Sequence, residues 1–171
     1  MGRFLTAPAR TEQLPQKGMY KLVDNELYED DDRSIYLHWR GFKTDNFTWI
    51  NSSDWDIRCS HGHDIGCKYH QILKVCMSYD ELISKGYLYQ HKEKWVCKDI
   101  PTKYLMVVDV SGHEINNLFY RMLKSADCPV TPKFIQCLYR AGVAFNLNWF
   151  LTGKTKIEPC MIYCDAWNKG E

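Results

Sequence analysis

The sequence has no long hydrophobic run, no excess of charge of one sign, no internal repeat and no low-complexity tract. No stretch approaches the roughly 20 apolar residues of a membrane-spanning helix. The formal net charge is +1, from 22 basic and 21 acidic residues, and the basic residues form no local cluster. This balance does not favour nucleic acid as a partner. Residues 1–10 have no apolar segment of the kind found in secretory signals, so none is expected.

Hydrophobic residues make up 45% of the chain and aromatic residues 14%, which indicates a packed globular protein. The eight cysteines are even in number, but a disulfide framework also requires an oxidising compartment. Cys67, Cys76 and Cys137 lie within apolar helical patterns, where a free cysteine acts as a small hydrophobic residue. We therefore expect reduced cysteines, with disulfides and metal ligation as the alternatives.

The chain divides into three parts. Residues 1–18 have two prolines and no periodicity, and read as an extended arm; 19–151 read as a single globular domain, and 152–171 as a C-terminal tail. Strand-like runs are expected at 19–28 and 34–39 around an acidic turn, at 87–97 as a hairpin turning at 91–94, and at 103–110 as a buried strand.

Helices are expected where apolar residues recur at helical spacing or where a capping pattern begins. Ile65, Tyr69, Ile72 and Cys76 predict a helix over about 60–77. The further helix starts are Ser78 with Glu81, ending at Gly86; Ser111 with Glu114, continuing to about Ser125; and Thr131 with Pro132.

The segment CSHGHDIGCKYH, residues 59–70, carries the densest set of metal-ligating side chains. Tetrahedral zinc is commonly bound by two short-spaced pairs of cysteine or histidine. Cys59, His61 and His63 offer one group, and Cys160 with Cys164 offer another, but neither has a second pair at diagnostic spacing. A structural zinc site is therefore one alternative for this segment.

His63 and Asp64 are adjacent on the expected helix, so their side chains point about 100° apart and can border one cleft. That arrangement suits a division of labour in which the imidazole activates water and the carboxylate holds a hard cation. A structural role is the default interpretation for four other histidines, His38, His61, His70 and His91.

Four motifs, in this order along the chain, resemble a small family common in tailed-bacteriophage genomes. They are GFKTD at 41–45, HD at 63–64, EINNLFYRM at 114–122 and YRAGV at 139–143, so the resemblance covers about 41–145. Residues 71–111 look like an enlarged insertion in this pattern. The family is similar in layout to phospholipase A2 domains, in which a helix bearing adjacent His and Asp packs against an antiparallel helix.

The resemblance implies roles for four residues. His63 would be the general base, Asp64 a calcium ligand together with Asp45 in the 41–46 loop, and Asn116 would occupy the position of the carboxylate that orients the histidine. Asn116 departs from the pattern because an amide accepts a hydrogen bond from imidazole but cannot stabilise imidazolium by charge. Cys67 stands where the family usually has tyrosine.

Taken together, these patterns predict an α+β fold with a phospholipase A2-like antiparallel helix pair, a third helix and peripheral β-hairpins. The expected function is that of a structural or accessory phage protein with an incomplete His-Asp site, located in the virion or the host cytoplasm, with other phage proteins as partners. The alternatives are a calcium-dependent phospholipid or ester hydrolase and a zinc-stabilised interaction module. Enzymatic activity is thus left open, with the non-enzymatic interpretation preferred.

Overall fold

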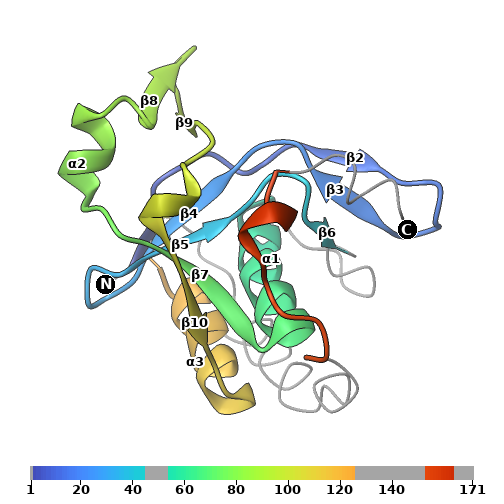
Figure 1. Ribbon diagram of the computed structural model, residues 1–171. Coiled ribbons are helices and arrows are strands. Elements are labelled where there is room, and N and C mark those ends of the chain that lie inside the picture. The colour runs from blue at the N-terminus through green and yellow to red at the C-terminus, as the bar shows by residue number, and fades with distance from the viewer. Residues whose placement is uncertain (1, 45–53, 126–152, 164–171) are drawn as a thin grey trace.

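The computed structural model describes residues 2–44, 54–125 and 153–163, and these form an α+β fold that is mostly β (Figure 1). The helices in this part of the chain are α1 (Asp54–Tyr69), α2 (Tyr79–Ser84) and α3 (Gly112–Leu123), with 3₁₀ turns at Thr102–Tyr104 and Pro159–Met161. The strands are β1 (Arg3–Phe4), β2 (Thr11–Gln13), β3 (Tyr20–Leu22), β4 (Glu26–Glu29), β5 (Ile35–His38), β6 (Lys43–Thr44), β7 (Gln71–Val75), β8 (Leu88–His91), β9 (Lys94–Cys97) and β10 (Leu105–Asp109).

The centre of the fold is an antiparallel sheet with strand order β1-β4-β5-β7-β10. β4 and β5 form a hairpin whose register places Glu26 opposite His38 and Tyr28 opposite Tyr36. Directly paired residues of an antiparallel sheet project from the same face. The hairpin therefore brings a carboxylate and an imidazole together inside the protein, where all four residues of β4 are buried.

Two helices pack together beside this sheet. α1 contacts α3 as well as strands β5 and β7 (Figure 1). Glycine permits the close approach of α1 to α3, because a Cβ added to Gly66 would lie 2.2 Å from Cγ1 of Ile115. The predicted α+β class with three helices is confirmed for the described residues, but the predicted phospholipase A2-like core is wrong. A five-stranded sheet forms the centre, and its strands β4, β5 and β7 bury Leu27, Ile35, Leu37, Ile72, Leu73 and Val75 in the core.

The predicted helix over 60–77 is also wrong at both ends. α1 begins earlier and ends at Tyr69, and His70 follows with a positive φ of 53°. Residues 71–75 then form β7 between β5 and β10, where Ile72, Leu73 and Val75 are buried. The spacing of the apolar residues fits a helix, but sheet pairing on both sides of β7 stabilises the extended conformation instead.

The expected N-terminal arm belongs to the fold. β1 pairs with β4 in the central sheet, and β2 pairs with β3 in a second sheet of order β2-β3-β6. The expected strand over 19–28 is divided at 23–25, because its two halves join different sheets. The predicted insertion, residues 71–111, supplies β7 and the edge strand β10 of the five-stranded sheet, whereas α2 and the β8–β9 hairpin extend away from the helix pair (Figure 1).

The local predictions that rest on turn and cap chemistry are confirmed. β4 and β5 are joined by the acidic turn, and β8 and β9 by a turn in which Lys92 and Glu93 have positive φ. Ser78 and Ser111 accept hydrogen bonds from the backbone N–H three residues later, as N-caps of α2 and α3. The predicted helix starting at 131 lies outside the described residues, and so does the structure of the tail beyond 163.

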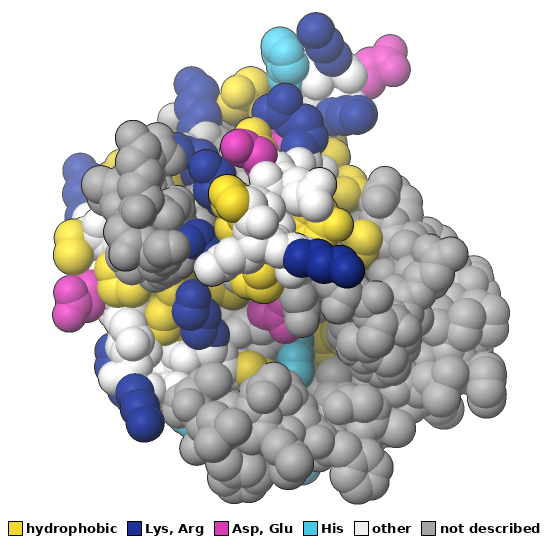
Figure 2. Space-filling view, turned by 90° about the vertical axis from the view of Figure 1, so that its right-hand side faces the viewer, with side chains coloured by type: hydrophobic (Ala, Val, Ile, Leu, Met, Phe, Trp, Pro, Cys, Tyr) yellow, Lys and Arg dark blue, Asp and Glu magenta, His cyan; other side chains and the backbone are white. Residues whose placement is uncertain are grey.

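On the face shown in Figure 2, basic side chains are spread over the described surface and do not form one patch, and the projecting β8–β9 end carries acidic and histidine side chains as well. Among the described helices, none has the length and hydrophobicity needed to cross a bilayer.

Candidate metal centre

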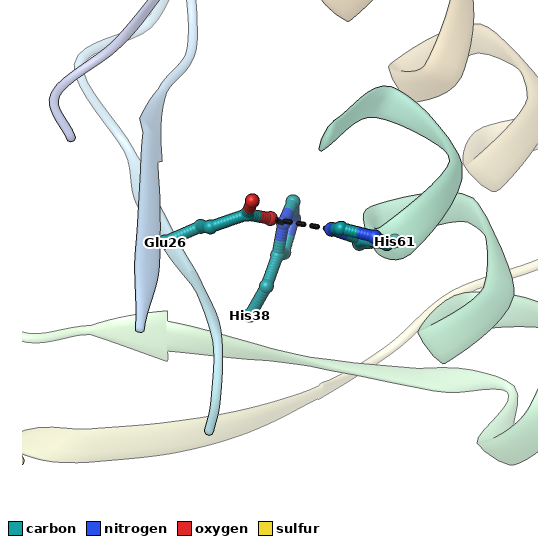
Figure 3. A group of neighbouring side chains, drawn as sticks. All are labelled: Glu26, His38 and His61. Atoms are coloured by element: carbon teal, nitrogen blue, oxygen red, sulfur yellow. Dashed lines mark hydrogen bonds and ion pairs between the residues drawn. The ribbon is translucent and has the colours of Figure 1, made fainter. Parts of the chain in front are cut away.

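Three buried side chains from three elements meet where α1 lies against the β4–β5 hairpin. Glu26 comes from β4, His38 from the opposite position on β5, and His61 from α1. Their exposed fractions are 0%, 2% and 1%, respectively. Figure 3 shows the two imidazoles directed at the carboxylate from different sides. The hairpin register and the packing of α1 together create the group.

One carboxylate oxygen is shared by both rings. Nδ1 of His61 lies 2.7 Å from Oε1 of Glu26, and Nδ1 of His38 lies 3.1 Å from the same oxygen. The other oxygen, Oε2, accepts a hydrogen bond of 2.8 Å from the backbone N–H of Ala9. An ionised carboxylate can only accept, so both Nδ1 atoms donate to it. Glu26 is thereby held from three directions.

The protonation states follow from burial and from this sharing of charge. Burial alone favours the protonated carboxyl of Glu26, but the imidazoles of His61 and His38 outweigh it and hold the pKa of Glu26 well below 4.5. Burial lowers the pKa of His38, against the opposing effect of Glu26. Glu26 is therefore ionised and His38 neutral near pH 7, which are the states required of metal ligands.

The distances also suit a metal ion. Candidate ligand atoms of Glu26, His38 and His61 all lie within 4.8 Å of one another. Ligands placed 2.0–2.1 Å from a tetrahedral zinc ion lie about 3.3 Å apart. The Nδ1–Oε1 separations are near this value but are those of hydrogen bonds, so coordination through Nδ1 would replace the proton that each ring donates to Glu26. Within the described ranges this is the one group of three or more ligating side chains close enough to share an ion. The three residues can therefore hold a metal.

A pocket of about 690 Å³ opens on one side of this group. Glu26 and His61 line it, whereas His38 lines a separate cavity of about 10 Å³ between β5, α1 and α3, near Gly62 and Met122. Nε2 of His38 is buried in that direction with no hydrogen-bond partner among the described residues. The described residues around the larger pocket are Phe4, Leu5, Thr6, Ala7, Pro8, Ala9, Arg10, Thr11, Glu26, Ile57, His61, Glu93, Lys94 and Trp95.

The structure brings His63 and Asn116 together, but away from both cavities. Nε2 of His63 donates to Oδ1 of Asn116 across 3.1 Å, from α1 to α3, and the ring lies 5.2 Å from that of Phe119. His63 is 4% exposed, and burial lowers its pKa to about 4, against the opposing effect of the Asn116 hydrogen bond. The sulfur of Cys67 is 3.4 Å from Nε2 and 3.7 Å from Nδ1. The imidazole is therefore neutral at pH 7 and enclosed by the helix pair.

Of the two expected calcium ligands, only Asp64 lies within the described residues. Asp64 is partly buried and accepts a hydrogen bond of 2.7 Å from the hydroxyl of Thr44, while Asp45 lies outside the described residues. Of the expected zinc ligands, Cys59, His61 and His63 are buried, Cys160 is exposed, and Cys164 lies outside the described residues. Neither expected set appears as a group of converging ligands in the described part of the chain.

The sequence patterns do not predict this group, because they suggest a structural role for His38, place His61 with Cys59 and His63 as its only candidate co-ligands, and do not point to Glu26. A signal was nevertheless present in the sequence. Glu26 and His38 are polar residues inside two apolar strand patterns, and pairing these strands around the turn at 30–34 places them opposite each other. Only the packing of α1 adds His61 to the pair.

Comparisons of the chain with protein-family models, with curated proteins and with solved structures found no match. The functional inference therefore rests on the geometry. The described residues supply one carboxylate and two imidazoles as ligands, next to a pocket of the size that small-molecule sites have.

Proposed function

We propose that Glu26, His38 and His61 bind a divalent metal ion of the zinc class, and that this ion faces the 690 Å³ pocket as a reactive centre. The observation that carries the proposal is the convergence of the three ligand atoms within 4.8 Å, in a group of which Glu26 and His61 line the pocket. Two imidazoles and one carboxylate are the ligands of many catalytic zinc sites, which keep a further position for water or substrate. Calcium is a poorer fit here, because it prefers six to eight oxygen ligands.

A metal in this position supports hydrolysis. As a Lewis acid it lowers the pKa of a bound water and polarises a carbonyl group. The ligands are firmly positioned for this role, since the Ala9 N–H holds Oε2 of Glu26 and the β4–β5 register fixes His38. Hydrogen bonds that orient ligands in this way strengthen metal binding.

The test is zinc binding by calorimetry on the purified, metal-free protein. Glu26→Gln and His61→Gln should each lose the binding seen in the unsubstituted protein. His63→Gln is the matched control, because His63 lies two residues from His61 on the same helix and on the other side of it, and it should bind zinc normally. Equal zinc affinity in all four proteins would overturn the proposal.

A second candidate is the calcium-dependent ester hydrolase expected from the sequence. The His63–Asn116 hydrogen bond supports it, as does the hydrogen bond between Asp64 and Thr44 of β6. It requires access of substrate to a histidine that is 4% exposed. Calcium binding that disappears in Asp64→Ala, with ester hydrolysis that disappears in His63→Ala, would support this candidate over the first.

We also propose a phage-related function, which is supported by the resemblance of the sequence motifs to the phage family. A protein of the virion or of the infected cytoplasm would use a buried ion to cross-link β4, β5 and α1, and would contact other phage proteins through its surface. The measurement is whether the protein co-purifies with assembled phage particles. Co-purification would support a role in the virion, and its absence from the particles would contradict that role.

A further inference from the structure

The pocket above the metal group has a chemical character that indicates its ligand, on the premise that the proposed metal binds. Its described walls are largely apolar, with Phe4, Ala7 and Pro8 from the N-terminal segment, Ile57 from α1 and Trp95 from β9. Small-molecule sites combine such walls with a few placed polar groups. Here the polar groups that could fix a ligand's orientation lie on the floor.

The charges at the rim largely cancel. Arg10 forms a two-point ion pair with Asp24, with hydrogen bonds of 2.9 Å from its Nε and Nη2 atoms. Lys94 and Glu93, at the start of β9 and in the turn before it, carry opposite charges. The described residues of the rim therefore give no strong preference for a charged ligand.

The floor, in contrast, would carry one uncompensated positive charge. A divalent ion bound by the Glu26 carboxylate and by two neutral imidazoles leaves a net charge of +1. His38 lies on the side away from the pocket, so the ion is approached past Glu26 and His61. An enclosed charge of this sign is matched by a single negative charge on the ligand.

We propose that the pocket binds an apolar monocarboxylate, with the carboxylate on the metal ion and the hydrocarbon part against Phe4, Ile57 and Trp95. Such an acid is the product of hydrolysing an apolar acyl ester or amide. In that reaction water adds its oxygen to the acyl carbon, the bond to the alcohol or amine breaks, and the released group takes a proton from the water. The substrate class is thus an acyl ester or amide with an apolar acyl chain.

The experiment titrates octanoate into the zinc-loaded protein and follows binding by calorimetry. Two matched probes separate the contributions: 1-octanol keeps the chain without the charge, and acetate keeps the charge without the chain. Octanoate should bind at least tenfold more tightly than either probe, and at least tenfold more tightly with zinc than without it. Equal binding of octanoate with and without zinc would overturn the proposal.

Two pocket variants locate the site. Ala7→Trp should fill the pocket and weaken octanoate binding at least tenfold, and Trp95→Ala should weaken it by removing an aromatic wall, while both retain zinc affinity. Retained zinc affinity with unchanged octanoate affinity would place the acid elsewhere and reject the pocket. Failure of the wild-type protein to bind zinc would instead reject the proposed metal centre, so the two proposals fail in distinguishable ways.

Discussion

Two buried histidine clusters lie on either side of α1, and they differ in the partner that each imidazole has. His61 points to the β4–β5 hairpin and shares the carboxylate of Glu26 with His38, beside a pocket. His63 points to α3, donates to the amide of Asn116 and packs on Phe119. Two residues along a helix are about 200° apart, so one helix serves both sites. Burial is common to both histidine clusters, whereas a charged partner next to a pocket distinguishes the metal site.

The largest expected effect comes from removing the charged partner. Glu26→Ala leaves two imidazole N–H groups and the N–H of Ala9 without their acceptor inside the protein, and should lower the free energy of unfolding by about 3–5 kcal/mol. Urea unfolding monitored by circular dichroism measures this. Glu12→Ala, at an exposed position on β2, is the matched control and should change stability by less than about 0.5 kcal/mol. Similar losses in both variants would contradict the stabilising role of the Glu26 carboxylate between the two imidazoles.

The next effect is the pH dependence contributed by His63. Its pKa is about 4 in the folded protein against 6.5 ordinarily, so the unfolded chain takes up the proton first as the pH falls. The contribution of neutral, buried His63 to the free energy of unfolding is fully present above pH 6.5. It is lost progressively as the pH falls from 6.5 to 4, by about 3 kcal/mol in all. His63→Gln should flatten the stability profile in that window, as measured by urea unfolding at a series of pH values. An unchanged slope between pH 6.5 and 4 would contradict the assignment.

A third prediction concerns a substitution that gives His63 a carboxylate partner, as His61 has in Glu26. Asn116→Asp replaces the amide next to His63 by a carboxylate, which favours imidazolium and should raise the pKa of His63 by about 1–3 units. NMR titration of the ring protons measures the change directly. Asn117→Asp, one position further on α3, serves as the control. If the pKa of His63 stays near 4 in Asn116→Asp, then Asn116 is not its hydrogen-bond partner in solution.

The smallest expected effects come from the two glycines that face the two clusters. A Cβ at Gly62 would lie 2.7 Å from Nε2 of His38, and one at Gly66 would lie 2.2 Å from Cγ1 of Ile115. Each alanine substitution should therefore cost about 1–3 kcal/mol through overpacking, measured by thermal or urea unfolding.

Zinc binding separates these two variants. Gly62→Ala displaces His38 and should weaken zinc affinity, whereas Gly66→Ala displaces only the α1–α3 contact and should leave it unchanged. Weaker zinc binding in Gly66→Ala than in Gly62→Ala would contradict the assignment of Gly62 to the side of α1 that faces the metal group and of Gly66 to the side that faces α3.

Much of the local structure follows from the sequence alone. Ser78 and Ser111 cap α2 and α3 because a hydroxyl near a helix start satisfies a free backbone N–H whatever the rest of the chain does. The β4–β5 and β8–β9 hairpins follow likewise from short polar turns between strand-like runs. Such features depend on residues only a few positions apart, and they were predictable for that reason.

The tertiary structure decided the rest. Residues 71–75 have a helical apolar period, yet they form β7, because strands β5 and β10 supply hydrogen bonds and burial on both sides. The candidate site shows the same division. The hairpin pairing of Glu26 with His38 is implicit in the sequence, but His61 joins them only through the packing of α1, from a position 35 residues away from Glu26. A metal centre depends on the distance between side chains in space, and that distance is fixed by the fold.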